Sequence, residues 1–240
     1  MIHPDAVSFD ICYRCLQKSP LFKGLDEKKI EEMLLSFRLE TWPRNSPAMD
    51  FRKTQKWFYV LLSGRLKVFQ SNPDSGREQT IFILGPGDAF DMICLLDGQE
   101  HEIYTESLDE LKVVSARIEV VRDWVVSHPE FNRTFLPYLG NQLRQLEELA
   151  SDLSLYDTES RLMRLILRHV DRDRSDNLLT LINDLSHEEL ANLIGSVRAV
   201  VNRHIQNLKG AGILITRRRQ MSINNFQALL ERVEKKLGLR

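Results

Sequence analysis

The spacing of apolar residues changes twice along this 240-residue chain, and this change constrains the fold more than any other feature. Between about residues 40 and 116, apolar residues form short runs that are rich in β-branched and aromatic side chains. Turn-forming segments such as Asn72–Gly76 and Gly85–Asp88 separate these runs. Many short strands without helices between them predict an antiparallel sandwich or roll, with a hairpin across Asn72–Gly76.

The apolar spacing is helical on either side of this region. A stripe before it predicts a helix that begins near Asp26. After Ile118, apolar residues recur at spacings of three and four in a heptad pattern: Leu136, Leu139, Leu143, Leu146, Ala150 and Leu153. We interpret this seam as a dimerisation helix; the alternative is an amphipathic helix lying on its own sheet. Pro137 predicts that the helix either starts close to this residue or bends there.

A break after the long helix marks a domain boundary. Asp157 is suited to cap the start of the next helix, because its carboxylate can accept free backbone N–H bonds. The apolar run Leu178–Ile182 predicts a strand further along.

The pattern that follows is typical of a helix-turn-helix. Ser186 and Glu189 form a capping box at the start of one helix. Gly195 and Ser196 supply a tight turn, and Val197–Lys209 predicts a second helix. Its apolar positions include Val197. The polar or small positions, suited to base edges in the major groove, are Arg198, Ala199, Asn202, Arg203 and Gln206.

A basic hairpin is predicted after the second helix. Two short apolar arms within residues 213–223 enclose Arg217, Arg218 and Arg219, which are suited to grip phosphates. From Thr158 onward the chain has 15 Lys and Arg against 9 Asp and Glu, a net charge of +6, whereas the preceding part carries −7. An acidic front and a basic, helix-turn-helix-bearing end predict binding to double-stranded DNA.

The three cysteines, Cys12, Cys15 and Cys94, favour reduced thiols or metal ligands over a disulfide framework. The C-x-x-C spacing of Cys12 and Cys15 is also compatible with a reversible disulfide or with an exposed reduced pair, and Cys94 with a small buried apolar residue. The chain shows neither an apolar run of about 18 residues nor a secretion signal. We therefore expect a cytoplasmic protein without membrane contact.

Taken together, these features resemble the Crp/Fnr family of bacterial transcription regulators. The matching segments are Phe58–Phe69, Gly85–Phe90, Asp157 and Leu185–Gly195. The resemblance implies an α+β protein with four parts: an N-terminal cysteine-bearing arm (1–18), an antiparallel β-roll sensor like a cyclic-nucleotide-binding domain (19–128), a long dimerisation helix (129–156) and a winged helix-turn-helix (157–240). It also implies a homodimer on a pseudo-palindromic promoter site, in contact with RNA polymerase.

The resemblance also implies which residues meet DNA. The expected contacts are Ser186, Ser196, Arg198, Ala199, Asn202, Arg203, Arg217, Arg218 and Arg219. Ala199 stands where many members have a glutamate, and Val197 replaces a common serine. A DNA site that differs from the best-known consensus is therefore expected.

The effector cassette departs from that of members that bind cyclic AMP, which carry a Gly-Glu pair and then an Arg-Ser pair. Here His101 and Glu102 stand in place of Arg-Ser, so a cyclic phosphate would face a carboxylate without a guanidinium. We therefore predict that cyclic AMP is not the effector. The expected effector pocket comprises Phe90, Ile93, Cys94, His101 and Glu102.

The resemblance leaves two cofactors open beside an unidentified small effector or redox signal. An iron–sulfur cluster needs four ligands; Cys12, Cys15 and Cys94 would supply three, and Asp10 or His3 a fourth. The other cofactor is a heme bound by Cys94 or His101.

Two other classes of function compete with DNA regulation. In a sensor protein, the helix-turn-helix would serve protein contacts, which the basic hairpin and the charge of +6 count against. In an enzyme we would expect a Ser/His/Asp set, closely spaced metal ligands or a phosphate-binding glycine loop, and the sequence shows none of these. We therefore predict a regulator without enzymatic activity.

Overall fold

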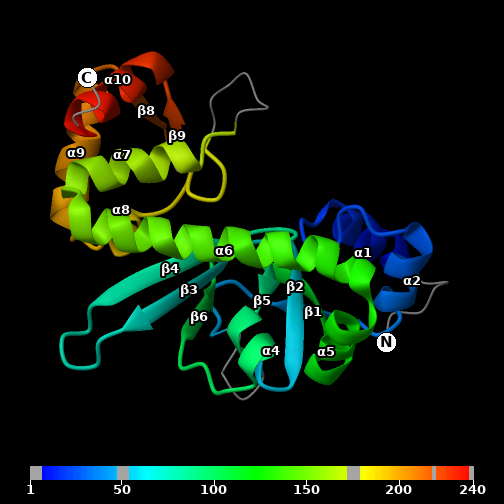
Figure 1. The fold of residues 1–240 in the computed structure, drawn as a ribbon. Helices are drawn as coiled ribbons and strands as arrows, with labels where there is room; N and C mark the ends of the chain where they lie inside the picture. The colour runs from blue at the N-terminus through cyan, green and yellow to red at the C-terminus, as the bar shows by residue number, and fades with distance from the viewer. Residues whose placement is uncertain (1–6, 48–53, 172–178, 218–219, 238–240) are drawn as a thin grey trace. The chain divides into compact units, whose positions relative to one another are not determined.

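The computed structural model divides the chain into two compact units (Figure 1). It describes residues 7–47, 54–171, 179–217 and 220–237. Unit 1 comprises residues 1–71 and 81–146, and unit 2 comprises residues 72–80 and 147–240. Strand β4 (Glu78–Leu84) and helix α6 (Pro129–Leu155) each contribute residues to both units.

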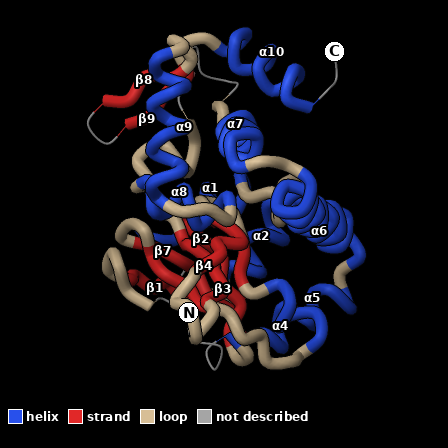
Figure 2. Tube along the Cα trace, turned by 90° about the vertical axis from the view of Figure 1, so that its left-hand side faces the viewer, coloured by secondary structure: helices blue, strands red, loops and turns tan. Residues whose placement is uncertain are grey.

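Unit 1 is built around antiparallel strands, as predicted. The strands are β1 (Arg38–Trp42), β2 (Trp57–Ser63), β3 (Leu66–Ser71), β4, β5 (Ala89–Phe90), β6 (Tyr104–Ser107) and β7 (Leu111–Arg117). One sheet has the order β1-β7-β2-β5, and a second sheet has the order β4-β3-β6. Buried residues such as Phe58, Val60 and Val114 form the core behind the first sheet. The strands lie together in Figure 2, where they are drawn in red.

Within the described residues, unit 1 also has the shorter helices α1 (Val7–Lys18), α2 (Glu27–Leu34), α4 (Met92–Asp97) and α5 (Ile118–Ser127). Asp26 caps α2 by accepting the backbone N–H of Lys28 at 3.2 Å, which confirms the predicted helix start. The cysteine-bearing arm is largely the helix α1, because Phe9, Cys12 and Leu16 recur at helical spacing and pack into the core. The expectation of an exposed cysteine pair is therefore wrong for Cys12.

The long helix α6 begins at Pro129, where the dimerisation helix was expected to begin, so of the two alternatives at Pro137 a helix start there is excluded. Proline is well tolerated in the first turn, where its missing N–H has no helical partner in any case. Pro137 lies inside α6 with its side chain exposed. The helix therefore loses one backbone hydrogen bond there but still runs to Leu155.

Unit 2 forms the predicted winged helix-turn-helix from α7 (Thr158–Arg168), α8 (His187–Ile194), α9 (Arg198–Gly210), β8 (Leu214–Arg217), β9 (Gln220–Ile223) and α10 (Phe226–Leu237). Its own apolar core joins these elements through residues such as Ile166, Leu190, Ile194, Val201 and Ile205. The turn predicted at Asn72–Gly76 also belongs to this unit, and the Gly76 N–H donates to the Asn72 carbonyl at 2.9 Å.

The predicted strand Leu178–Ile182 is wrong. In the described part of this segment, Leu179 makes only an isolated bridge to Val170, and Leu181 has a positive φ of 60°. Leu179 and Ile182 are buried in the core of unit 2. The apolar run therefore reflects burial of an irregular segment, and Leu178 lies outside the described residues.

Candidate DNA-reading head and effector pocket

The helix-turn-helix begins with the predicted capping box. The Glu189 N–H donates to Ser186 Oγ at 3.1 Å, and the Ser186 N–H donates to the Glu189 carboxylate at 2.6 Å. The turn after α8 requires glycine. Gly195 has φ +62°, and an added Cβ would lie 2.5 Å from Leu153 Cδ2 and 3.1 Å from Gln79 Oε1.

Helix α9 has one buried and one exposed face. The buried face packs against the rest of unit 2 and comprises Val201, His204, Ile205 and Leu208. The exposed side chains include all those expected to read bases: Arg198, Ala199, Asn202, Arg203 and Gln206. Arg198, Ala199, Asn202 and Arg203 lie in the N-terminal half of α9, the part that a recognition helix presents to base edges, and Gln206 lies beyond it.

Val197 differs from the prediction. It is the N-cap of α9 rather than part of the buried stripe, and 57% of its surface is exposed. A residue at the N-cap lies outside the helical period, so the spacing could not reveal its orientation. Val197 and Ala199 thus place two small apolar side chains beside Arg198, suited to contact thymine methyl groups.

The wing is the antiparallel pair β8–β9, in which Arg217 lies opposite Gln220. The Met221 N–H donates to the Asn183 carbonyl at 2.8 Å and thereby ties the hairpin to the segment before α8. Arg217 is exposed at the end of β8. Arg218 and Arg219 lie outside the described residues.

Asp157 caps α7 as predicted, because its carboxylate accepts a hydrogen bond from the Ser160 N–H at 2.9 Å. The same carboxylate forms an ion pair with the Lys236 ammonium group at 3.0 Å. Partial burial opposes ionisation of Asp157, but these two hydrogen bonds outweigh it and hold its pKa at about 2. The carboxylate therefore stays charged at neutral pH.

Arg161, which the sequence reasoning missed, joins three chain segments of unit 2. Its guanidinium donates to the carbonyls of Tyr156 and Leu153, both at 2.7 Å, and of Ile194 at 3.1 Å. These carbonyls lie at the ends of α6 and α8, where helical partners are absent. The only local signal was an arginine in the first turn after a cap.

The β3–β4 hairpin supplies three further polar contacts within unit 2. Arg77 donates to the Gly195 carbonyl at 2.8 Å, and Gln79 donates to the Leu193 carbonyl at 3.3 Å. Asn192 donates to the Glu78 carboxylate at 3.1 Å. These contacts hold the turn of the helix-turn-helix. They join residues more than 100 positions apart, so the sequence pattern gave no indication of them.

The predicted seam residues on α6 have different surroundings in the single chain. Leu136 and Leu143 are each 59% exposed. Leu139 and Leu146 are half-buried and line a cavity of unit 1, as does Leu143. Leu153 lies close to Gly195 in unit 2. An apolar face on α6 thus remains open at Leu136 and Leu143.

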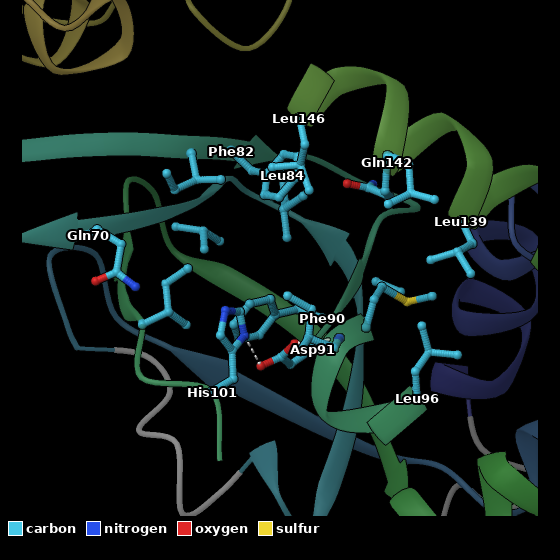
Figure 3. A pocket seen from close by; sticks show the side chains of 17 residues that line it. Gln70, Phe82, Leu84, Phe90, Asp91, Leu96, His101, Leu139, Gln142 and Leu146 are labelled. Atoms are coloured by element: carbon cyan, nitrogen blue, oxygen red, sulfur yellow. Dashed lines mark hydrogen bonds and ion pairs between the residues drawn. The ribbon is translucent and has the colours of Figure 1, made fainter. Parts of the chain in front are cut away.

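The cavity has a volume of about 350 Å³ and lies entirely within unit 1 (Figure 3). Its walls come from β3, β4, β5, α4, α6 and the loop after α4: Val68, Gln70, Ile81, Phe82, Leu84, Ala89, Phe90, Asp91, Met92, Ile93, Leu96, His101, Ile103, Leu139, Gln142, Leu143 and Leu146. This size is within the range of small-molecule sites.

The buried Asp91 and the half-buried His101 form a pair that provides the polar centre of the cavity. Asp91 Oδ2 lies 2.7 Å from His101 Nδ1, and Oδ1 accepts the Ile93 and Cys94 N–H groups at the start of α4. The hydrogen bond that His101 Nδ1 donates to the Asp91 carboxylate raises the pKa of His101, although burial works against it. Asp91 was not among the predicted site residues; its position just before α4, as a possible N-cap, was the available signal.

Three of the five predicted pocket residues, Phe90, Ile93 and His101, line the cavity; the assignments of Cys94 and Glu102 to it are wrong. Cys94 faces the other side of α4, where its thiol contacts Thr54 Oγ1 at 3.8 Å and the Gln99 carbonyl at 3.3 Å. Glu102 lies on an exposed loop with its side chain in solvent.

The cysteines do not form the expected metal site. Within the described part of the chain, no three His, Cys, Asp or Glu side chains gather as metal ligands. Burial raises the pKa values of Cys12 and Cys94 to about 11, so both remain protonated thiols at neutral pH. Among the residues that the structure describes, the cysteines do not fit an iron–sulfur cluster, and Cys94 does not line the cavity as a heme ligand would. His3 lies outside the described residues.

Comparisons with known proteins agree with both units. Residues 160–232 match the family described as Crp-like helix-turn-helix domain, and residues 51–128 match the cyclic nucleotide-binding domain. The CRP-like cAMP-activated global transcriptional regulator of Mycobacterium tuberculosis is 24% identical over 90% of this chain and 97% of the relative. The global nitrogen regulator of Synechococcus elongatus is 27% identical over 71% of this chain and 78% of that protein.

Solved structures agree on the fold. A CooA mutant from Carboxydothermus hydrogenoformans superimposes with a TM-score of 0.70 at 22% identity, covering 84% of this chain and 90% of that one. FixK2 from Bradyrhizobium japonicum superimposes with a TM-score of 0.71 at 19% identity, covering 81% of this chain and 96% of that one. No helix in the described residues is long and apolar enough to cross a membrane. With both domain matches, full-length relatives and this fold in agreement, the chain belongs to the Crp/Fnr family of transcription regulators.

Proposed function

We propose that the protein acts as a homodimer that reads a two-half-site promoter through α9 and responds to an effector other than cyclic AMP in the cavity of unit 1. The observation that carries this proposal is the exposed face of α9, where Arg198, Asn202 and Arg203 project from a helix whose opposite face is buried. Arg and Asn are the side chains that pair with guanine and adenine in the major groove. The family resemblance extends the proposal to a contact with RNA polymerase.

The experiment is selection of bound duplexes from a random pool by the full-length protein. The expected result is an enriched pair of inverted half-sites whose centres lie about 10–10.5 base pairs apart, or a multiple of this distance. Transcription from a promoter with this site, using purified RNA polymerase, tests the polymerase contact. A pool that shows no enrichment would contradict the proposal, and a single unpaired half-site would contradict the dimer.

Dimerisation is expected to depend on the open face of α6. Leu136→Glu combined with Leu143→Glu should give monomers in sedimentation, because two carboxylates would then be buried in the apolar seam. Leu139 and Leu146 are left intact because they are already half-buried in the single chain, whereas Leu136 and Leu143 are each 59% exposed. The matched control is Val126→Glu, which charges an 83% exposed residue of α5 outside the seam. An unchanged dimer mass in the double variant would show that the seam is elsewhere.

Cyclic AMP is expected not to bind with micromolar affinity, which would correspond to about −8 kcal/mol. Among the described residues that line the cavity, none is Lys or Arg, and Asp91 adds a negative charge. A cyclic phosphate would therefore lose its hydration without gaining a cationic partner. Titration calorimetry measures this, with the cAMP-activated Mycobacterium tuberculosis relative as positive control. A titration of this protein that gives a micromolar dissociation constant for cyclic AMP would overturn the prediction that cyclic AMP is not the effector.

A further inference from the structure

The polar groups of the cavity in unit 1 are few and lie apart from one another. Four of the seventeen lining residues are polar, and they are Gln70, Asp91, His101 and Gln142. Gln70 and His101 lie toward one end, whereas Gln142 comes from α6 (Figure 3). Between them the walls are aliphatic and aromatic, including Phe82 and Phe90. A ligand must therefore bury mostly apolar surface and can satisfy its polar group at one end.

His101 has hydrogen-bonding capacity directed at the cavity. Its Nδ1 is taken up by Asp91, whose other oxygen is already occupied by the start of α4. The ring projects into the cavity, and its Nε2 has no hydrogen-bond partner within the described part of the chain (Figure 3). Asp91 is only 2% exposed, so the pair holds the ring in a fixed direction. Nε2 is therefore placed to meet a ligand.

The charges around the cavity select against an anion. No guanidinium or ammonium lines it among the described residues, and the Asp91 carboxylate lies beside His101. An anion bound to His101 would be repelled by the negative charge of Asp91. It would also lose its hydration on entering a mostly apolar cavity. A neutral hydroxyl group avoids both costs. It also both donates and accepts, so it matches Nε2 whether that nitrogen carries a proton or not.

We propose that the cavity binds a neutral alcohol with an apolar, ring-sized body, its hydroxyl on His101 Nε2 and its body between Phe82, Phe90 and the α6 leucines. This deepens the proposed function, on which it rests for the role of the cavity as effector site. The ligand would contact Leu139 and Leu146 of α6 directly, so its binding would affect the packing of the helix that carries the seam.

The test uses three probes with the same ring and chain length: 3-phenylpropan-1-ol, propylbenzene and 3-phenylpropanoate. Calorimetry with the full-length protein is expected to show about 5–10-fold tighter binding of the alcohol than of propylbenzene, the worth of one net hydrogen bond. The carboxylate is expected to bind most weakly. Equal binding of alcohol and hydrocarbon, tighter binding of the carboxylate, or no binding of any probe would overturn the inference.

Two variants locate the hydroxyl. His101→Leu is expected to reduce the affinity of the alcohol to that of propylbenzene and to leave propylbenzene unchanged. If the leucine variant does not fold, His101→Phe replaces it, because its ring also lacks a hydrogen-bonding group. The matched control is Glu102→Gln, which alters the next residue but not the cavity and should change no affinity. Loss of propylbenzene binding in a folded His101 variant would contradict the proposed pose. A heme absorbance band that disappears in His101→Leu would also overturn it.

Retardation of the selected duplex is measured separately, in the absence of any probe. If the duplex is retarded and no probe binds, the inference fails and the proposed function stands. If the alcohol binds as expected and no duplex is selected, the proposed function fails while the site stands.

Discussion

Replacing Arg203 with Ala is expected to weaken binding to the selected DNA site by about 1–3 kcal/mol for each half-site and to change binding to random DNA little. Arg203 is exposed on the N-terminal half of α9, where side chains reach base edges. A guanidinium that pairs with guanine contributes only when that base is present. The variant should therefore lose discrimination at one base pair in each half-site.

The matched comparison is Arg217→Ala on the wing, which removes the same charge from an exposed strand end. This variant should weaken selected and random duplexes alike, and the slope of log affinity against log salt should become shallower by about two for a dimer. Gel retardation over a salt series measures both quantities. If Arg203→Ala weakens both duplexes equally while Arg217→Ala affects only the selected one, the two roles are reversed.

Replacing Arg161 with Gln is expected to destabilise unit 2 by about 2–4 kcal/mol, because three carbonyls lose a charged donor at once. For a domain of this size such a loss lowers the unfolding midpoint by on the order of 10 °C. Since Arg161 ties α8 to the end of α6, affinity for the selected duplex should fall as well. Scanning calorimetry and retardation measure the two effects.

Two further variants separate position from charge. Lys235→Gln removes an exposed positive charge from unit 2 and should leave the unfolding midpoint unchanged. Arg161→Lys keeps the charge but cannot reach three carbonyls in one plane, so it should recover only part of the stability. Full stability of Arg161→Gln would show that water replaces the guanidinium at these carbonyls.

The features that the sequence predicted correctly are those fixed by neighbouring residues. The capping box of Ser186 and Glu189, the cap at Asp157 and the turn at Asn72–Gly76 each involve side chains within four positions of one another. Their hydrogen bonds form wherever the local backbone adopts the turn, so residue type and spacing suffice. The exposed face of α9 follows in the same way from helical periodicity.

The predictions that failed depended on contacts between distant segments or on direction around a short element. Ile93 and Cys94 are adjacent in a six-residue helix, yet only the first lines the cavity. A step of one residue turns a side chain by about 100° around a helix, and so short a helix gives no period to read. The pairing of Asp91 with His101 joins a helix start to a later loop, which no spacing rule anticipates.

Residues 72–80 of the β3–β4 hairpin belong to unit 2 and therefore limit how this protein can be divided into fragments. A fragment that begins at residue 147 contains all helices of the DNA-reading head but lacks Arg77 and Gln79, which donate to the carbonyls of Gly195 and Leu193. An excised head should therefore melt at a lower temperature than the same residues within the full chain. A chimera that exchanges heads between relatives would have to transplant residues 72–80 together with the C-terminal segment, because one cut in the chain does not separate a complete reading head.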